Sequence, residues 1–126
     1  MAATKVRTSI WSSQTLTASS SNTNSSWIDL SAGYGAQVDI KLTNGATGPT
    51  VPAQVQIQVA NDYNAGSPTL ITNFGGAFIG STANSDVTYA SATIPFPVAA
   101  LRLVAGSNTG QNVTVDADIS NVTAVS

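Results

Sequence analysis

Residues 37–43 read QVDIKLT, a strict alternation of polar and apolar side chains. Successive side chains of an extended chain point to opposite faces, so the three apolar residues share one face. Residues 54–59 (QVQIQV) and 113–119 (VTVDADI) repeat the pattern. Such alternation predicts half-buried antiparallel strands. The predicted core comprises the apolar residues of these three stretches: Val38, Ile40, Leu42, Val55, Ile57, Val59, Val113, Val115 and Ile119.

Weaker alternation extends over much of the remaining chain. It predicts further strands at residues 5–11, 15–18, 27–30, 74–79, 86–94 and 98–105. The pair Gly75-Gly76 indicates a bulge in its strand, and Asn44-Gly45 marks a turn between two strands. About eight strands, spaced roughly 8–12 residues apart, predict an all-β domain. We expect an antiparallel β-sandwich, eight-stranded and jelly-roll-like.

The N-terminal quarter differs in composition from the rest of the chain. Residues 19–26 read SSSNTNSS, a polar stretch that predicts a loop or hinge. We therefore expect residues 1–26 to form an extended N-terminal arm with its Ser/Asn-rich stretch, and residues 27–126 to form the sandwich. On this hypothesis, deletion of residues 1–20 leaves the sandwich folded.

The composition excludes large classes of chemistry. The chain has 126 residues, with no Cys and no His, and only 8% of its residues are charged. The usual zinc, haem, copper and iron–sulfur ligand sets need His or Cys, as do Ser-His-Asp and Cys-His catalysis. We therefore expect no cofactor, no metal site and no enzymatic activity. The absence of Cys also excludes a disulfide framework, so stability comes from packing or association.

Charge and hydropathy limit the partners. The net charge is -2 and the pI is near 4.4, and four scattered cations form no stripe for nucleic acid. The N-terminus lacks the apolar region of a signal peptide. No apolar run reaches the ~18 residues of a membrane span. We expect a protein made in the cytoplasm without a signal peptide that binds neither nucleic acid nor membrane.

Two groups of residues invite a functional interpretation. Asp116 and Asp118 point to the same strand face, roughly 7 Å apart, and could form an acid pair or half of a calcium site. The sequence lacks the remaining ligands of a calcium loop, which favours a solvent-facing or interface-facing pair. Trp11, Trp27, Tyr34 and Tyr63 could stack on sugar rings, but such aromatics more often fill cores or anchor interfaces.

Two stretches carry a resemblance to a known group of proteins. They are YGAQVDIKLTNGATGPTVPAQVQIQVANDY at 34–63 and LRLVAGSNTGQNVTVDADIS at 101–120, about two-fifths of the chain. In composition and in short sequence patterns they resemble small β proteins of tailed-bacteriophage virions. The size is similar to that of capsid decoration (cement) proteins. These proteins clamp neighbouring capsid subunits, often as dimers or trimers at symmetry axes.

The resemblance implies a non-catalytic structural protein on the virion capsid surface, bound to the major capsid protein and to itself as a homodimer or homotrimer. The arm and two loops would then make the contacts, through Lys5, Arg7, Ile10, Trp11, Thr47 and Tyr63. Repetition of modest contacts by symmetry gives avidity against the pressure of the packed genome. Two alternatives remain open: a tail or fibre component, and a carbohydrate-binding β-sandwich on the virion surface.

Overall fold

The computed structural model of the chain describes residues 3–19, 22–95 and 97–125. Strands dominate the described residues, and the one helical element is a single 3-10 turn. The elements in chain order are β1 (Ala3–Leu16), β2 (Thr23–Asn24), β3 (Ile28–Asp29), β4 (Ala36–Asn44), β5 (Gln54–Ala60), η1 (Asn64–Gly66), β6 (Ile71–Asn73), β7 (Phe78–Ile79), β8 (Val87–Ile94), β9 (Ala100–Gly106) and β10 (Val113–Val125).

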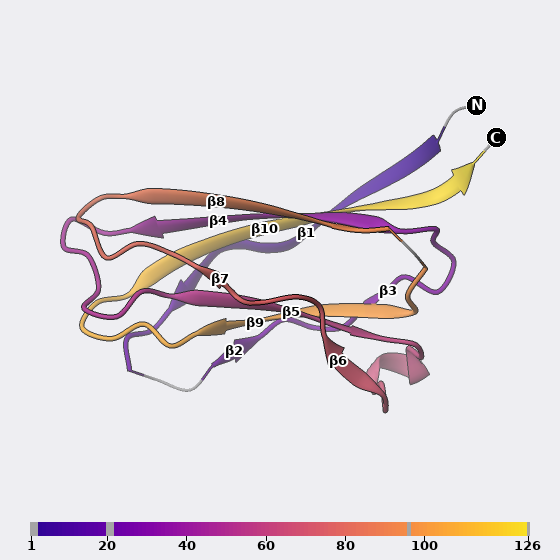
Figure 1. Ribbon diagram of the computed structural model, residues 1–126, viewed down its shortest axis with the longest axis horizontal. Helices are drawn as coiled ribbons and strands as arrows, with labels where there is room; N and C mark the ends of the chain where they lie inside the picture. Colours follow the sequence, from indigo (N-terminus) through magenta and orange to yellow (C-terminus); the bar gives the residue numbers. More distant parts are fainter. Residues whose placement is uncertain (1–2, 20–21, 96, 126) are drawn as a thin grey trace.

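The strands form two antiparallel sheets that pack face to face (Figure 1). Sheet A has the order β1-β10-β4-β8. In sheet B, β9 and β5 are central, β2 and β3 pair with the outer side of β9, and β6 and β7 pair with the outer side of β5. Two short strands thus share each outer position of sheet B, so ten strands occupy eight positions.

This order is that of a jelly roll. When each pair of short strands counts as one position, sheet A contains the first, eighth, third and sixth strands, and sheet B contains the second, seventh, fourth and fifth. Consecutive strands therefore cross between the sheets except at the fourth and fifth positions, as in the double Greek key of jelly rolls. The predicted all-β antiparallel sandwich is confirmed.

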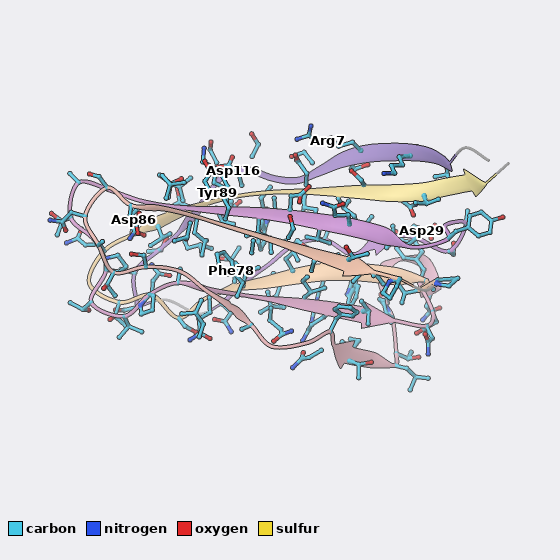
Figure 2. The ribbon with its side chains drawn as sticks, turned by 45° about the horizontal axis from the view of Figure 1, so that its top comes forward. Arg7, Asp29, Phe78, Asp86, Tyr89 and Asp116 are labelled. Atoms are coloured by element: carbon cyan, nitrogen blue, oxygen red, sulfur yellow. The ribbon has the colours of Figure 1, made fainter. Side chains whose placement is uncertain are left out.

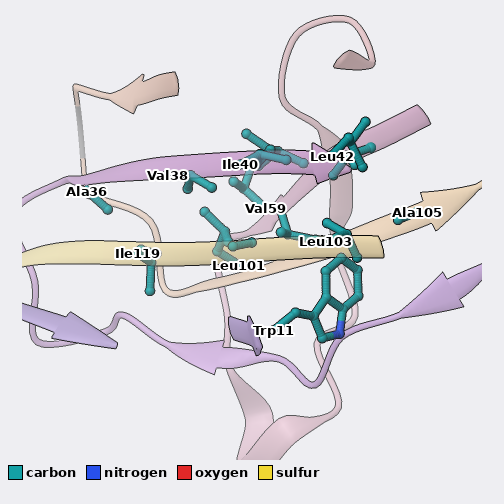
Figure 3. Close-up of a cluster of buried hydrophobic side chains, with 14 of the residues drawn as sticks. Trp11, Ala36, Val38, Ile40, Leu42, Val59, Leu101, Leu103, Ala105 and Ile119 are labelled. Carbon is teal, nitrogen blue, oxygen red and sulfur yellow. The ribbon is translucent and has the colours of Figure 1, made fainter. Parts of the chain in front are cut away.

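The core lies between the two sheets, where the alternating strands place their apolar faces (Figure 3). All nine residues of the predicted core are buried. The register explains how they meet, because Val38 lies opposite Ile119 and Leu42 lies opposite Val115 on the inner face of sheet A. From sheet B, Leu101 and Leu103 of β9 enter the same cluster. Burial of one face of each central strand is the main stabilising contribution.

The structure corrects the prediction of a separate N-terminal arm. β1 pairs with β10 along its whole length as the edge strand of sheet A, and Trp11 and Leu16 are buried in the core. The predicted hinge also departs from expectation, since Thr23–Asn24 pairs with β9 as β2. Residues 20 and 21 of that hinge lie outside the described residues. Beyond the start of β4, β1 and β10 continue as a two-stranded ribbon (Figure 1).

The predicted strand at 74–79 is also corrected. Instead of one bulged strand, two short strands, β6 and β7, flank the glycine pair. Gly75 has a φ of 69°, a left-handed conformation that favours glycine and breaks the ladder. Gln56 of β5 fixes the break, because its Nε2 donates to the carbonyl oxygen of Gly75 at 3.1 Å.

Candidate interaction surfaces

The four predicted contact residues of the N-terminal segment divide into two groups. Lys5 and Arg7 are exposed on β1, and Arg7 forms an ion pair with Asp118. Ile10 is half-buried and packs against the core cluster, and Trp11 is a member of that cluster. Trp11 is therefore a core residue in this fold, which corrects the prediction that it contacts a partner.

The two predicted loop contacts lie far from each other. Thr47 is exposed in the connection after β4, where the neighbouring Gly48 N–H donates to Asn84 Oδ1 at 2.9 Å. Tyr63 is half-buried and directly precedes η1, past the opposite end of β5. The connection and η1 lie at opposite ends of the sandwich (Figure 1). Thr47 and Tyr63 therefore do not form one site.

A carboxylate organises the loop around Tyr63. Asp62 accepts hydrogen bonds from the Thr69 N–H at 3.2 Å and the Thr69 hydroxyl at 3.1 Å. Burial alone would raise the pKa of Asp62, but these bonds and one from the Leu70 N–H outweigh it and lower the pKa below its usual value. The bonds favour the ionised form because a carboxylate accepts hydrogen bonds better than a neutral acid does.

We expect acid to loosen this loop. Because the pKa of Asp62 is lowered on folding, its stabilising effect is present above the unfolded value of ~3.9 and is lost as pH falls through the folded pKa. Protection of the Thr69 amide against exchange, relative to its intrinsic rate at each pH, should fall as pH drops below about 4. The substitution Asp62→Asn should cause the same loss of protection at neutral pH, and Asp116→Asn, on the other sheet, should not. Unchanged Thr69 exchange in Asp62→Asn would contradict this role.

The outer face of sheet A concentrates the charges of the chain. Three of the six Asp and two of the four Lys or Arg lie around a shallow depression of about 440 Å³. We call this surface the charged face; its members are Arg7, Asp39, Lys41, Asp116 and Asp118, with Tyr89 beside them. Figure 2 shows Arg7, Asp116 and Tyr89 on this side of the sheet.

Two carboxylates of the charged face lie directly opposite each other. Asp118 on β10 pairs in register with Asp39 on β4, an arrangement that alone is destabilising. Arg7 offsets it, because its Nε donates to Asp118 Oδ2 at 2.9 Å and its Nη2 also contacts that oxygen. Hydrogen bonding to Asp118 raises the pKa of the Arg7 guanidinium. Asp39 accepts hydrogen bonds from Ser91 and Gln37.

Asp116 and Asp118 bind different partners on β1. Asp118 is ion-paired with Arg7, whereas Asp116 Oδ1 accepts the Ser13 N–H at 2.8 Å. Each carboxylate therefore holds β1 onto β10 at a different point of the strand pair. Among the described residues, no three His, Cys, Asp or Glu side chains gather as a metal site.

The aromatic residues occupy three kinds of environment. Trp11 is in the core, and the ring of Trp27 is covered by the guanidinium of Arg102 at 4.7 Å, a cation–π contact. Tyr34 and Tyr89 project into solvent, with 58% and 72% of their surface exposed. Of these, Tyr89 lies beside the charged face, where its ring could stack on a ligand.

The side of the sandwich between β8 and the β6–β7 segment is open and apolar; we call it the open side. A cleft of about 220 Å³ lies there, with Ala90 and Ala92 on one wall, Phe74 and Phe78 on the other, and Ile40, Val55 and Ile57 among its lining. Along the adjoining edge of sheet B, Leu70, Ile71 and Ile79 are exposed. Leu70 and Ile71 lie toward one end of β5 and Ile79 toward the other, and exposed apolar residues along a sheet edge are typical of contact surfaces.

Sequence reasoning missed the open side as a site. Its aromatic residues come from the segment around the glycine pair, and its small residues come from β8. These two segments are separated in the sequence and become neighbours only in the folded chain. One signal was present in the sequence: β8 carries two alanines, Ala90 and Ala92, at successive inward-facing positions, where the central strands carry mostly Val, Ile or Leu. Small residues on the inner face of an edge strand leave space beneath it.

The strand order defines the chain as a jelly-roll β-sandwich, and solved structures with a similar fold exist. No protein-family model matches the sequence, and no curated protein matches it significantly. Among solved structures, infectious bursal disease virus (Gx strain) contains a chain with a TM-score of 0.57 and 8% identity over 94% of this chain. This chain spans about a third (32%) of that viral chain.

Two smaller proteins are similar over nearly their whole length. The SPBc2 prophage-derived protein YomS has a TM-score of 0.50 and 12% identity, covering 95% of this chain and 96% of its own. A protein of Bacillus endospore appendages, which form disulfide-linked pili, has a TM-score of 0.50 and 10% identity, covering 99% and 93%. At these identities the similarity establishes the shared fold. Separately, none of the helices in the described residues could cross a membrane.

Proposed function

We propose that the chain is a non-catalytic structural protein of a virion that decorates a phage capsid by clamping neighbouring capsid subunits. The observation that carries the proposal is the open side, where Leu70, Ile71 and Ile79 are exposed beside an apolar cleft. A chain with 8% charged residues that exposes such a surface is suited to permanent contact with other subunits. The jelly-roll similarity to a viral particle and a prophage protein supports the proposal.

The proposal includes two partners, the major capsid protein and further copies of the chain as a homodimer or homotrimer. Its first test is mass spectrometry of purified particles with shell and tail fractions separated. We expect the chain in the shell fraction at a constant ratio to the major capsid protein. Confinement to tails at a few copies would replace capsid decoration by the tail or fibre function. Absence from both fractions would overturn a structural role in the virion.

A matched pair of variants tests the open side directly. Leu70→Ser with Ile71→Ser should weaken binding of the purified chain to capsids that lack it by at least about tenfold, since both apolar contacts are lost. Val51→Ser alters a comparably exposed apolar residue outside the open side and should bind as the unmodified chain does. Equal binding by all three proteins, at unchanged thermal stability, would exclude the open side as the contact surface.

One observation favours a second candidate, a carbohydrate-binding function. Tyr89 is exposed beside a depression lined by Asp39, Lys41 and Asp116, which combines an aromatic ring with hydrogen-bonding groups. Binding of a soluble glycan should then shift the NMR signals of the Tyr89 ring and be lost in Tyr89→Ala. Trp11 is buried but also lines this depression, so tryptophan fluorescence provides a second readout of binding.

A further inference from the structure

The four sheet edges in the described part of the chain differ in how they are protected against pairing with another strand. In sheet B both edges consist of short strands, of two residues each (β2, β3) or of three and two (β6, β7). In sheet A, β1 carries Lys5 and Arg7 and has three register shifts against β10. Short strands, charges and bulges are the features that prevent edge pairing in natural sheets.

β8, the other edge of sheet A, has none of these protections. Its eight residues read VTYASATI, with no charge and no Pro, and its register against β4 runs unbroken from Val87 to Ile94. Within the described residues, β8 pairs with no strand on its outer side. A long, regular and uncharged edge is a template for an added strand.

The ladder fixes which backbone groups face outward. Asn44 N–H donates to the carbonyl of Asp86 at 2.9 Å, and bonded and non-bonded pairs alternate along an antiparallel ladder. The N–H and C=O groups of Tyr89, Ser91 and Thr93 therefore point away from β4. Those three residues span roughly 14 Å of open edge. The outward N–H of Val87 is already satisfied, because it donates to Asp86 Oδ1 at 3.0 Å.

The apolar cleft lies directly beneath this edge. Ala90 and Ala92, the inward-facing residues of β8, form one of its walls, and Phe78 lies on the inner side of sheet A below β8 (Figure 2). A strand added to β8 alternates its side chains, so every second one points into the cleft. At about 220 Å³ the cleft is smaller than the ~300 Å³ of typical ligand pockets and matches one or two side chains.

The chemistry of the edge selects its occupant. With the same face inward, a second β8 would bring Thr88, Ala90, Ala92 and Ile94 toward the cleft, with two small alanines at its centre, and eight residues a side is well below the ~20–30 of a stable dimer interface. The occupant therefore carries bulky apolar residues at alternate positions. The carboxylates of Asp39 and Asp86 adjoin β8 with Lys41 as the one cation on the neighbouring strand, so charge complementarity favours basic over acidic residues in the remaining positions.

We infer that β8 binds an extended segment of a partner polypeptide as a fifth strand of sheet A. Backbone groups of Tyr89, Ser91 and Thr93 hold the segment, and its alternate bulky apolar side chains enter the cleft beside Phe74 and Phe78. The inference adds a binding mode to the proposed function. It rests on that function only for the identification of the partner as a capsid subunit. The edge and the cleft define the segment whichever protein carries it.

The test uses the full chain, isotopically labelled, and an octapeptide with blocked ends, Lys-Ile-Thr-Phe-Thr-Ile-Thr-Lys. We expect NMR shifts at the amides of Tyr89, Ser91 and Thr93 and at the Ala90 and Ala92 methyl groups. A control peptide with Ser in place of Ile and Phe should bind at least about tenfold more weakly, because alternate apolar side chains supply the pocket contacts. Shifts confined to other surfaces, or none, would overturn the inference.

Two variants separate the edge from the cleft. Ser91→Pro removes an outward N–H that β4 does not use, which an edge strand tolerates. It should weaken peptide binding at least about tenfold through the lost bond and the ring, while Ser91→Ala binds normally. Ala90→Leu fills the cleft and should also weaken binding, which keeps the inference testable if Ser91→Pro does not fold. Equal binding by the folded variants would overturn it.

The remaining outcomes distinguish this inference from the proposed function. Self-association of the chain that Ser91→Pro abolishes would identify a second copy as the occupant and overturn the choice of a different polypeptide. Peptide binding at β8 by a chain that fails to bind capsids would retain the strand-addition site and overturn capsid decoration. Capsid binding that Ser91→Pro leaves intact would retain decoration and overturn β8 as the site.

Discussion

Deletion of residues 1–16 should leave no cooperatively folded sandwich. The deletion removes β1, the strand that pairs with β10 along the edge of sheet A, and with it the buried side chains of Trp11 and Leu16. Truncation of a buried Trp costs about 3–5 kcal/mol and of a buried Leu about 2–5 kcal/mol. Together these losses are comparable to the ~5–15 kcal/mol that stabilises a whole domain. Thermal unfolding followed by circular dichroism measures the effect.

Two milder changes serve as controls for that deletion. Removal of residues 1–4 shortens only the ribbon beyond β4 and should retain a sharp unfolding transition. Trp11→Ala should fold but lose about 3–5 kcal/mol, since it empties one position of the core. A sharp transition and dispersed amide signals in the chain without residues 1–16 would instead restore the hypothesis of a detachable arm.

The sequence predicts the sandwich well because its central strands bury one face and expose the other. Strict alternation at 37–43, 54–59 and 113–119 placed all nine predicted core residues correctly. The alternation at 5–11 correctly predicts a strand, but it does not predict that Trp11 faces the core, because β1 is irregular. Its register against β10 shifts between Ser9 and Trp11, and a bulge reverses which face the following side chains occupy. A strict period of two therefore assigns Trp11 to the wrong face.

The candidate surfaces were less accessible to sequence reasoning than the core. Burial follows from local periodicity, but a contact surface depends on which strands become edges. Ala90 and Phe78 line the same cleft only because β8 and β7 lie at the same side of the two sheets. The strand order that places them there is set by long-range pairing. Exposed Lys5 and Arg7 could be predicted because charged residues on an edge strand remain in solvent.

Substitution of Leu103 in β9, a central strand of sheet B, should be strongly destabilising. Leu103 has no exposed surface, lies opposite Ile57 of β5, and belongs to the core shared by both sheets. Leu103→Ala leaves a cavity that rigid neighbouring strands cannot close. We expect a loss of about 2–5 kcal/mol in the free energy of unfolding, measured by urea denaturation.

The matched control is the leucine with the most exposed side chain. Leu70 is 70% exposed, so Leu70→Ala should change the free energy of unfolding by no more than about 0.5 kcal/mol. Because the core joins the two sheets, the Leu103→Ala transition should be a single one. Fluorescence of Trp11 and Trp27 and far-ultraviolet circular dichroism should then report the same midpoint. Separate midpoints, or equal stabilities of the two variants, would contradict a single core shared by both sheets.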